Sequence, residues 1–215
     1  MGYRIAMARE CADGIVDGDY THDPLVMEVS GYQGWARSVN LLVGIVMARH
    51  PEAEWFVTGG DDYFPDPNKR AEEIAQECSC EGLLRRTFGV MQPTGDRWGE
   101  RNGIATIDRI AGSPWMGREF CRRMYHGSGP MYNGYYHNFA DEELQCVAGQ
   151  LGVFWQRRDL TQEHRHWARP RGDWRDAPDW AHKINNPQFS DWDKSKALFA
   201  ARKAAGFPGH EPLEI

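Results

Sequence analysis

The sequence has few cysteines, no internal repeat and no long apolar run, and these absences exclude several classes of protein. Its five cysteines are odd in number and contain no CxxC pair, which argues against a disulfide framework and a zinc ribbon. No apolar stretch approaches the roughly 20 residues that cross a bilayer. The first residues contain no apolar signal-peptide core. We therefore expect a protein that does not insert into a membrane and that works in a reducing cytoplasm.

The charge of the chain is unevenly distributed. Its 215 residues suffice for one full domain with a substantial core, and the net charge is −6. Residues 1–155 hold 14 Lys/Arg and 22 Asp/Glu, whereas residues 156–205 hold 11 Lys/Arg and 7 Asp/Glu. The second segment also contains Trp167, Trp174, Trp180 and Trp192. Such a segment could bind a phosphate backbone and stack on bases, or its tryptophans could dock it onto the main domain, which we favour.

Stretches typical of strands and of helices alternate along the chain, which predicts an α/β sandwich. The expected helices cover 36–49, 69–77, 118–125, 141–151 and a last helix that Ser190 caps and that runs to 205. The expected strands cover 3–8, 25–29, 54–58, 87–92, 104–111 and 153–156.

An acid pair, Asp61-Asp62, follows the apolar run 55–58 and precedes a turn marked by Pro65 and Pro67. Carboxylates at the carboxyl end of a buried strand lie where open α/β sheets bind their ligands. Carboxylate oxygens are natural ligands of Mg²⁺ or Mn²⁺, and such a metal commonly accompanies a diphosphate. The alternative is a solvated turn, because Asp, Gly and Pro are ordinary turn residues.

Three further polar features follow the acid pair in the chain. Gly112-Ser113 comes after the expected strand 104–111, and Asp141-Glu142 opens the expected helix 141–151. The third feature is a pair of histidines, His164 and His166, after the last expected strand. Acids also favour helix N-termini for electrostatic reasons, so the pair at 141–142 has a structural explanation as well.

In this order the motifs resemble those of the GT-A class of nucleotide-sugar glycosyltransferases, especially the inverting, family-2-like branch, over about residues 30–167. Residues 31–40, which end at Asn40, are similar to that family's "N-x-G-x-x-x-A-x-N" helix opening. Residues 58–67 resemble its strand-end acidic DxD motif, Ala111-Gly112-Ser113 its "GS", and Asp141-Glu142-Glu143-Leu144 its "ED-x-x-L". His164 or His166 stands where the family often supplies a late histidine to the metal.

The resemblance implies a Rossmann-like α/β/α sandwich of the GT-A type with a mixed sheet and a helical, loop-rich C-terminal extension. It divides the chain into a catalytic domain, 1–167, and a basic Trp-rich extension, 168–215. Within the catalytic domain, 1–111 is the nucleotide-sugar part and 112–167 the acceptor part. The donor is a UDP-sugar or a similar nucleotide sugar.

The resemblance also assigns roles to residues. It implies a divalent metal, Mn²⁺ or Mg²⁺, and a general base that takes the proton of the acceptor hydroxyl. The implied metal ligands are Asp61, Asp62, His164 and His166; the implied donor contacts are Asp61, Asp62, Gly112, Ser113 and Asn40. The implied base is Asp141, with Glu142 as the alternative.

The chain departs from the family's pattern in three places. The first acid of the usual DxD is Gly60, and the usual "ED" is Ala140-Asp141. Residues 162–167 are similar to the QxxRW signature of processive synthases, but the tryptophan is displaced by one position. A processive polymer synthase is therefore disfavoured.

The acceptor is a separate question. The basic tail and the cationic helix with Arg118, Arg122 and Arg123 favour a nucleic acid, and the chain resembles phage enzymes that glycosylate hydroxymethylated pyrimidines in DNA. Such an enzyme flips its target base out of the duplex and works in the host cytoplasm. The alternatives are a cell-surface saccharide as acceptor, or a metal-dependent phosphohydrolase or nuclease that uses the same acids. A non-catalytic DNA-binding module is disfavoured by the acidic balance of residues 1–155.

Overall fold

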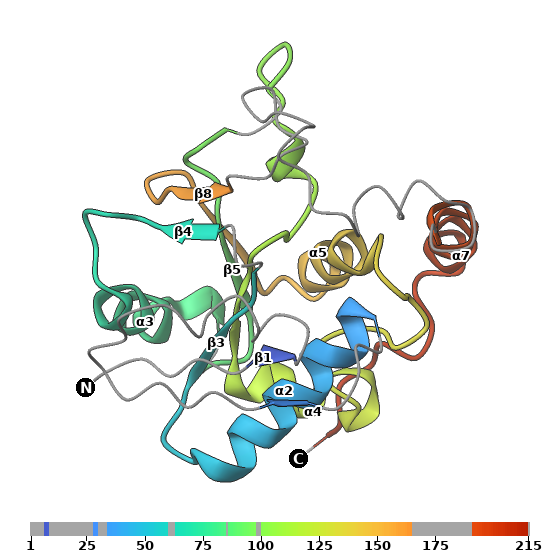
Figure 1. Ribbon diagram of the computed structural model, residues 1–215, viewed down its shortest axis with the longest axis horizontal. Helices are drawn as coiled ribbons and strands as arrows, with labels where there is room; N and C mark the ends of the chain where they lie inside the picture. The colour runs from blue at the N-terminus through green and yellow to red at the C-terminus, as the bar shows by residue number, and fades with distance from the viewer. Residues whose placement is uncertain are drawn as a thin grey trace.

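The computed structural model describes residues 7–8, 28–29, 34–59, 63–84, 86–97, 100–164 and 191–214 of the chain. These residues form a mixed α/β fold around a central four-stranded sheet, with two further sheets of two strands each (Figure 1). In the described part of the chain, none of the helices is both long and apolar enough to cross a membrane.

The central sheet is mixed, as expected, and has the strand order β3-β6-β5-β7. Its strands are β3 (Trp55–Val57), β5 (Val90–Pro93), β6 (Trp115–Gly117) and β7 (Phe154–Arg157). β6 runs antiparallel to both of its neighbours, whereas β5 and β7 are parallel. All four residues of β5 are buried, because this strand is covered on both faces of the sheet.

Two short pairs of strands lie outside the central sheet. β1 (Met7–Ala8) is parallel to β2 (Glu28–Val29). β4 (Tyr63–Pro65) is antiparallel to β8 (Gln162–His164), which comes from a distant part of the chain. The second pair joins the segment that follows the acid pair to the segment that contains the late histidine.

Helices cover both faces of the central sheet. The helices next to the sheet are α2 (Trp35–Arg49), α3 (Ala71–Cys80), α4 (Arg118–Gly127) and α5 (Ala140–Gln150), and α7 (Trp192–Ala204) lies on the outer side of α5 (Figure 1). Met116 and Val90 pack with α2, α4 and α5 in the larger apolar core, whereas their neighbours Trp115 and Met91 pack with α3 in the smaller one. Successive residues of a strand point to opposite faces, so the fold is a sandwich with α3 on one side of the sheet (Figure 1).

Most expected elements are confirmed, within a few residues at each end. The expected helices over 36–49, 69–77, 118–125 and 141–151 correspond to α2, α3, α4 and α5, and α7 begins at Trp192. The N-cap residue of α7 is Asp191 and not Ser190, because the helix begins one residue later than that cap requires. Residues 3–6 and 25–27 of the first two expected strands lie outside the described residues. The strand expected from 87 begins at Val90, because Arg86 and Thr87 have left-handed φ values of 56° and 67° that a strand does not allow.

The strand expected over 104–111 is wrong. This segment contains a short 3₁₀ helix, Thr106–Asp108, whose turn is closed by the carboxylate of Asp108 accepting the N–H of Ala105 at 3.0 Å. The isoleucines at 104, 107 and 110 recur every three residues, which is the period of a 3₁₀ helix and not of a strand. The strand of this region is β6, which starts just after Gly112-Ser113-Pro114.

Candidate functional site

The loop with the acid pair joins β3 to β4, and its first end is fixed to the segment that precedes β6. Asp61 and Asp62 lie outside the described residues. Thr58, the last residue before the Gly-Gly pair, donates its N–H to the Pro114 carbonyl at 3.2 Å. Its own carbonyl accepts the hydroxyl of Ser113 at 2.5 Å. A Cβ on Gly59 would lie 3.0 Å from the same hydroxyl, so this close approach favours glycine.

The second end of the loop is fixed by the β4–β8 pair. In its antiparallel register, Tyr63 lies opposite His164, so the residue directly after Asp62 is paired with the late histidine. Asp66 holds the other end of this pair, because its carboxylate accepts both the N–H and the hydroxyl of Thr161, at 2.9 and 3.1 Å. These bonds, above all the one from the backbone of Thr161, lower the pKa of Asp66 below its ordinary value.

Ser113 is completely buried at the point where three strand ends meet. Its hydroxyl donates to Thr58 and accepts the side-chain amide of Gln162, the first residue of β8. Its backbone N–H donates to the side chain of Gln92 in β5 at 3.2 Å. The hydroxyl is therefore engaged inside the protein, where it aligns the end of β3 with the start of β8. Of the two residues predicted to contact the nucleotide-sugar donor, Gly112 is half-buried and accessible for such a contact, whereas Ser113 is completely buried.

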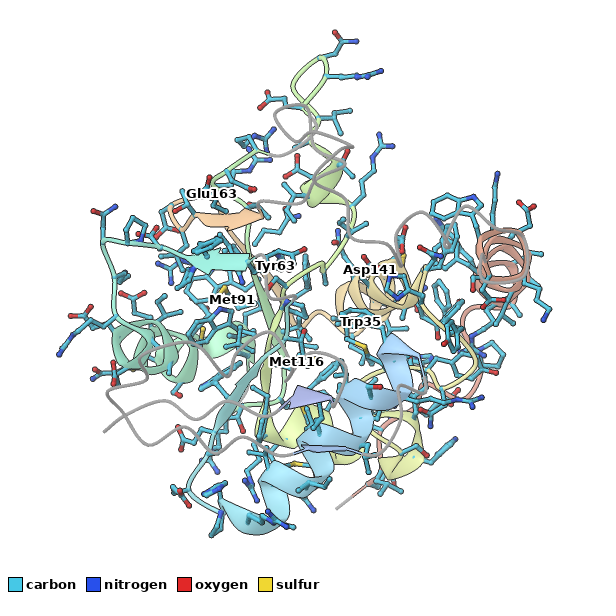
Figure 2. All side chains as sticks on the ribbon, viewed as in Figure 1. Trp35, Tyr63, Met91, Met116, Asp141 and Glu163 are labelled. Atoms are coloured by element: carbon cyan, nitrogen blue, oxygen red, sulfur yellow. The ribbon has the colours of Figure 1, made fainter. Side chains whose placement is uncertain are left out.

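Asp141 and Glu142 lie in the first turn of α5, next to the same segment. The backbone carbonyl of Asp141 accepts the N–H of Ala111 at 3.4 Å, so Ala111 contacts α5 while Ser113, two residues on, contacts Thr58. Three residues extend over at most roughly 10 Å. The start of α5 and Thr58, which precedes the loop with the acid pair, are therefore close neighbours, and Figure 2 shows Tyr63 and Asp141 at the same end of the central sheet.

Glu142, in the first turn of α5, has a strongly shifted pKa. Burial above all, together with a hydrogen bond to Asp141 and the negative charge of that neighbour, raises the pKa of Glu142 to about 9. Glu142 is therefore protonated at neutral pH, and its partner is the Asp141 carboxylate. Of the two residues predicted as the base, Glu142 is disfavoured by this raised pKa, which leaves Asp141 as the candidate.

Asn40, predicted to contact the donor, is instead bonded to the loop that precedes α5. Its amide donates to the Met131 carbonyl at 2.7 Å and to the side chain of Asn133 at 2.8 Å. Its oxygen accepts the N–H of Met131 at 3.0 Å. These bonds give Asn40 a structural role, in which it fixes the loop 129–133 against α2.

Each of the three arginines of the cationic helix α4 has a partner within the chain. Arg118 donates to the carbonyls of Met47, His50 and Ala53 at 3.0–3.1 Å, where α2 ends and leaves carbonyls without helical partners. Arg122 pairs with Glu119, and Arg123 donates to the Leu213 carbonyl and lies over the ring of Phe88. The expectation that α4 offers a cationic face to a nucleic acid is therefore not supported by its contacts.

Several residues that shape the site were missed from the sequence. They are Tyr63, Gln92, Thr161 and Gln162 around the loop, and Glu143 in α5, which is paired with Arg202 of α7. Only Gln92 could have been found from the sequence. Its amide ends an apolar run, and a buried amide needs hydrogen-bonding partners. The other contacts join segments that are far apart in the chain.

Within the described residues, no group of three or more His, Cys, Asp or Glu side chains could hold a metal ion. The predicted ligands Asp61, Asp62 and His166 lie outside those residues, and so does the side chain of His164. Comparisons of the chain with protein-family models, with curated proteins and with solved structures found no match. The geometry of the site is therefore what supports a function for this protein.

Proposed function

We propose that the protein is a metal-dependent, inverting glycosyltransferase of the GT-A type that moves a sugar from a nucleotide-sugar donor to an acceptor hydroxyl. One observation carries the proposal: the pairing of Tyr63 with His164. It brings the segment after the acid pair beside the late histidine, although the two are far apart in the sequence. The residues on either side of the acid pair, Thr58 and Tyr63, are held in place, and a binding site requires such fixed flanks.

The ligand atoms that this region could offer to a metal suit Mn²⁺ or Mg²⁺. Asp61 and Asp62 would supply carboxylate oxygens, and His164 or His166 a neutral imidazole nitrogen, which together favour Mn²⁺. The metal, when bound, neutralises the charge that develops on the nucleoside-diphosphate leaving group. The contacts of Thr58, Ser113 and Tyr63 hold the two ends of the acid loop for this purpose.

Asp141 serves as the general base in this proposal. An acceptor hydroxyl is a poor nucleophile at neutral pH and needs a base within hydrogen-bond reach. Protonated Glu142 donates to the Asp141 carboxylate and keeps a second negative charge away from the anionic donor. An inverting transfer is one displacement, so it needs a general base and no second nucleophile on the protein.

The acceptor that we propose is a hydroxymethylated pyrimidine in phage DNA. The support is the basic, Trp-rich composition of residues 156–205, most of which lie outside the described residues. The contacts of Arg118, Arg122 and Arg123 remove α4 from this argument. A cell-surface saccharide is the alternative acceptor, and a phosphohydrolase or nuclease is the alternative activity.

Mass spectrometry tests reaction and acceptor together. DNA that contains hydroxymethylcytosine or hydroxymethyluracil is incubated with the protein, Mn²⁺ and a mixture of UDP-glucose, UDP-galactose and UDP-N-acetylglucosamine. A sugar-sized mass gain on the modified base supports the proposal, and Asp141→Asn should abolish it. Cleaved DNA or free sugar phosphate without any transfer would favour the hydrolase instead.

A further inference from the structure

We infer that α7 is a positioning element for the acids at the start of α5, held by Arg202 on one side of them and by Phe199 on the other. This inference rests on the proposed function, in which Asp141 is the base. The two helices lie side by side in Figure 1. Although the sequence separates α7 from the catalytic domain, its contacts with that domain are specific and buried.

The first contact is a buried ion pair that fixes Glu143. This residue is completely buried, and the guanidinium of Arg202 donates to both of its carboxylate oxygens, at 2.8 and 2.6 Å. The hydroxyls of Tyr125 and Tyr135 also donate to the carboxylate, at 2.9 and 2.7 Å. Four donors to one carboxylate leave Glu143 a single orientation.

The second contact is an aromatic stack that fixes Phe139, the residue before α5. Its backbone is left-handed, with a φ of 71°, which an ordinary residue adopts only when its surroundings impose it. The ring of Phe199 in α7 stacks on it at 5.5 Å, and the ring of Trp192 lies 4.9 Å away. Phe199 itself packs against Phe207, which is in the larger core.

These two contacts bracket Asp141 and Glu142. Phe139 comes two residues before Asp141, Glu143 comes two residues after it, and α7 holds both. Because a displacement of about 1 Å can cost an enzyme roughly 100-fold in rate, an element that fixes both flanks of the base controls turnover. It does so without contacting the donor.

The test compares Arg202→Met with two controls on the same helix. Lys196→Met removes an exposed cation, and Leu198→Ala removes apolar packing against the larger core but keeps Arg202 and Phe199. Hydrogen exchange of the amides of 139–143 reports the order of the first turn of α5. Turnover is measured as UDP release from the three UDP-sugars with hydroxymethyluracil DNA, and donor-site binding as the affinity for UDP with Mn²⁺. If Arg202→Met does not fold, Phe199→Leu replaces it, since this variant leaves no buried charge unpaired.

We expect Arg202→Met to speed exchange at 139–143 by about tenfold or more and to lower kcat by about 100-fold. UDP affinity and the KM of the donor should change less than about threefold. Lys196→Met should match the wild type. Leu198→Ala should keep the wild-type kcat even if its Tm falls as much as that of Arg202→Met. Unchanged exchange at 139–143, or an equal loss of kcat in a Leu198→Ala variant of equal Tm, would overturn the inference. If the wild-type protein releases no UDP, the proposed function is overturned. The positioning of the first turn of α5 by α7 is tested separately, by the exchange rates at 139–143.

Discussion

The hydroxyl of Ser113 donates a hydrogen bond to the carbonyl of Thr58 at 2.5 Å and in this way joins the segment before β6 to the end of β3. The same hydroxyl accepts the amide of Gln162, so a single oxygen connects the two chain segments that carry the predicted metal ligands. Ser113 therefore links these two segments, and its contribution to stability and to UDP binding can be measured.

Ser113→Ala should lower the free energy of unfolding by about 1–3 kcal/mol, because it leaves the Thr58 carbonyl and the Gln162 amide buried without a partner. It should also weaken UDP binding in the presence of Mn²⁺, since both ends of the acid loop lose a constraint. Urea denaturation and calorimetry measure the two effects. Ser128→Ala, at an exposed serine, is the control and should leave both within error. An unchanged free energy of unfolding in Ser113→Ala would show that the hydrogen bonds of this hydroxyl do not stabilise the protein.

Asp141→Asn and Glu142→Gln should behave differently in the transfer assay. Removal of the base should cost about 10²- to 10⁴-fold in turnover, with UDP affinity nearly unchanged. Glu142→Gln keeps a hydrogen-bond donor next to Asp141 and should retain most of the activity. An active Asp141→Asn together with an inactive Glu142→Gln would exchange the two roles.

The stability of the protein should fall as the pH rises from about 4.5 to about 9, through the titration of Glu142. The pKa of this group is raised from 4.5 to about 9 in the folded state, so between these values the folded protein binds more protons than the unfolded chain. The contribution is complete below pH 4.5 and is lost as the pH passes the folded value. Urea denaturation at pH 5, 7 and 9 should show a shallower pH dependence for Glu142→Gln than for the wild type. Glu72→Gln, at an exposed glutamate in α3, should keep the wild-type slope.

Asp62→Ala and His164→Ala should each abolish the Mn²⁺-dependent part of UDP binding, and chelation with EDTA should do the same to the wild type. Isothermal titration of UDP with and without Mn²⁺ measures this. Asp193→Ala and His126→Ala, at exposed positions on other elements, are the matched controls and should bind as the wild type does. Metal-dependent binding that survives in both Asp62→Ala and His164→Ala would place the metal elsewhere.

Arg118→Met should act on stability and not on DNA binding. Its guanidinium satisfies three carbonyls at the end of α2, and hydrogen bonds from a charged group contribute about 1.5–3 kcal/mol. The free energy of unfolding should fall by about that amount, while the salt dependence of DNA binding stays the same. By contrast, Arg169→Ala and Arg171→Ala should reduce that salt dependence if the tail contacts phosphates. If Arg118→Met makes the salt dependence of DNA binding shallower, α4 does contact the nucleic acid.

Much of the fold could be predicted because its helices have clear apolar periodicity. Val39, Val43 and their neighbours in α2 recur at helical spacing and are buried as that spacing implies. β6 was missed because Trp115, Met116 and Gly117 form a three-residue strand, too short for alternation to show, while the isoleucines of 104–110 suggested a strand that is not there. The mixed sheet depends on this one strand.

The site was predictable in its residue types and not in its connections. Acids after an apolar run and at a helix start are visible in one sequence, and the histidine of β8 indeed lies beside the segment that follows the acid pair. The roles of Ser113 and Asn40 were not visible, because each depends on partners that lie 21 to 93 residues away in the chain. A side chain that bonds only to distant segments leaves no local pattern.

The ion pair between Glu143 and Arg202 has a consequence for the order in which the protein matures. During synthesis, Arg202 leaves the ribosome 59 residues after Glu143. Until then a nascent chain offers this carboxylate the hydroxyls of Tyr125 and Tyr135 but no cation, and burial of a charge without its ion-pair partner is costly. The core around α5 therefore closes late in translation, and the first turn of that helix reaches its final form only once α7 has been made.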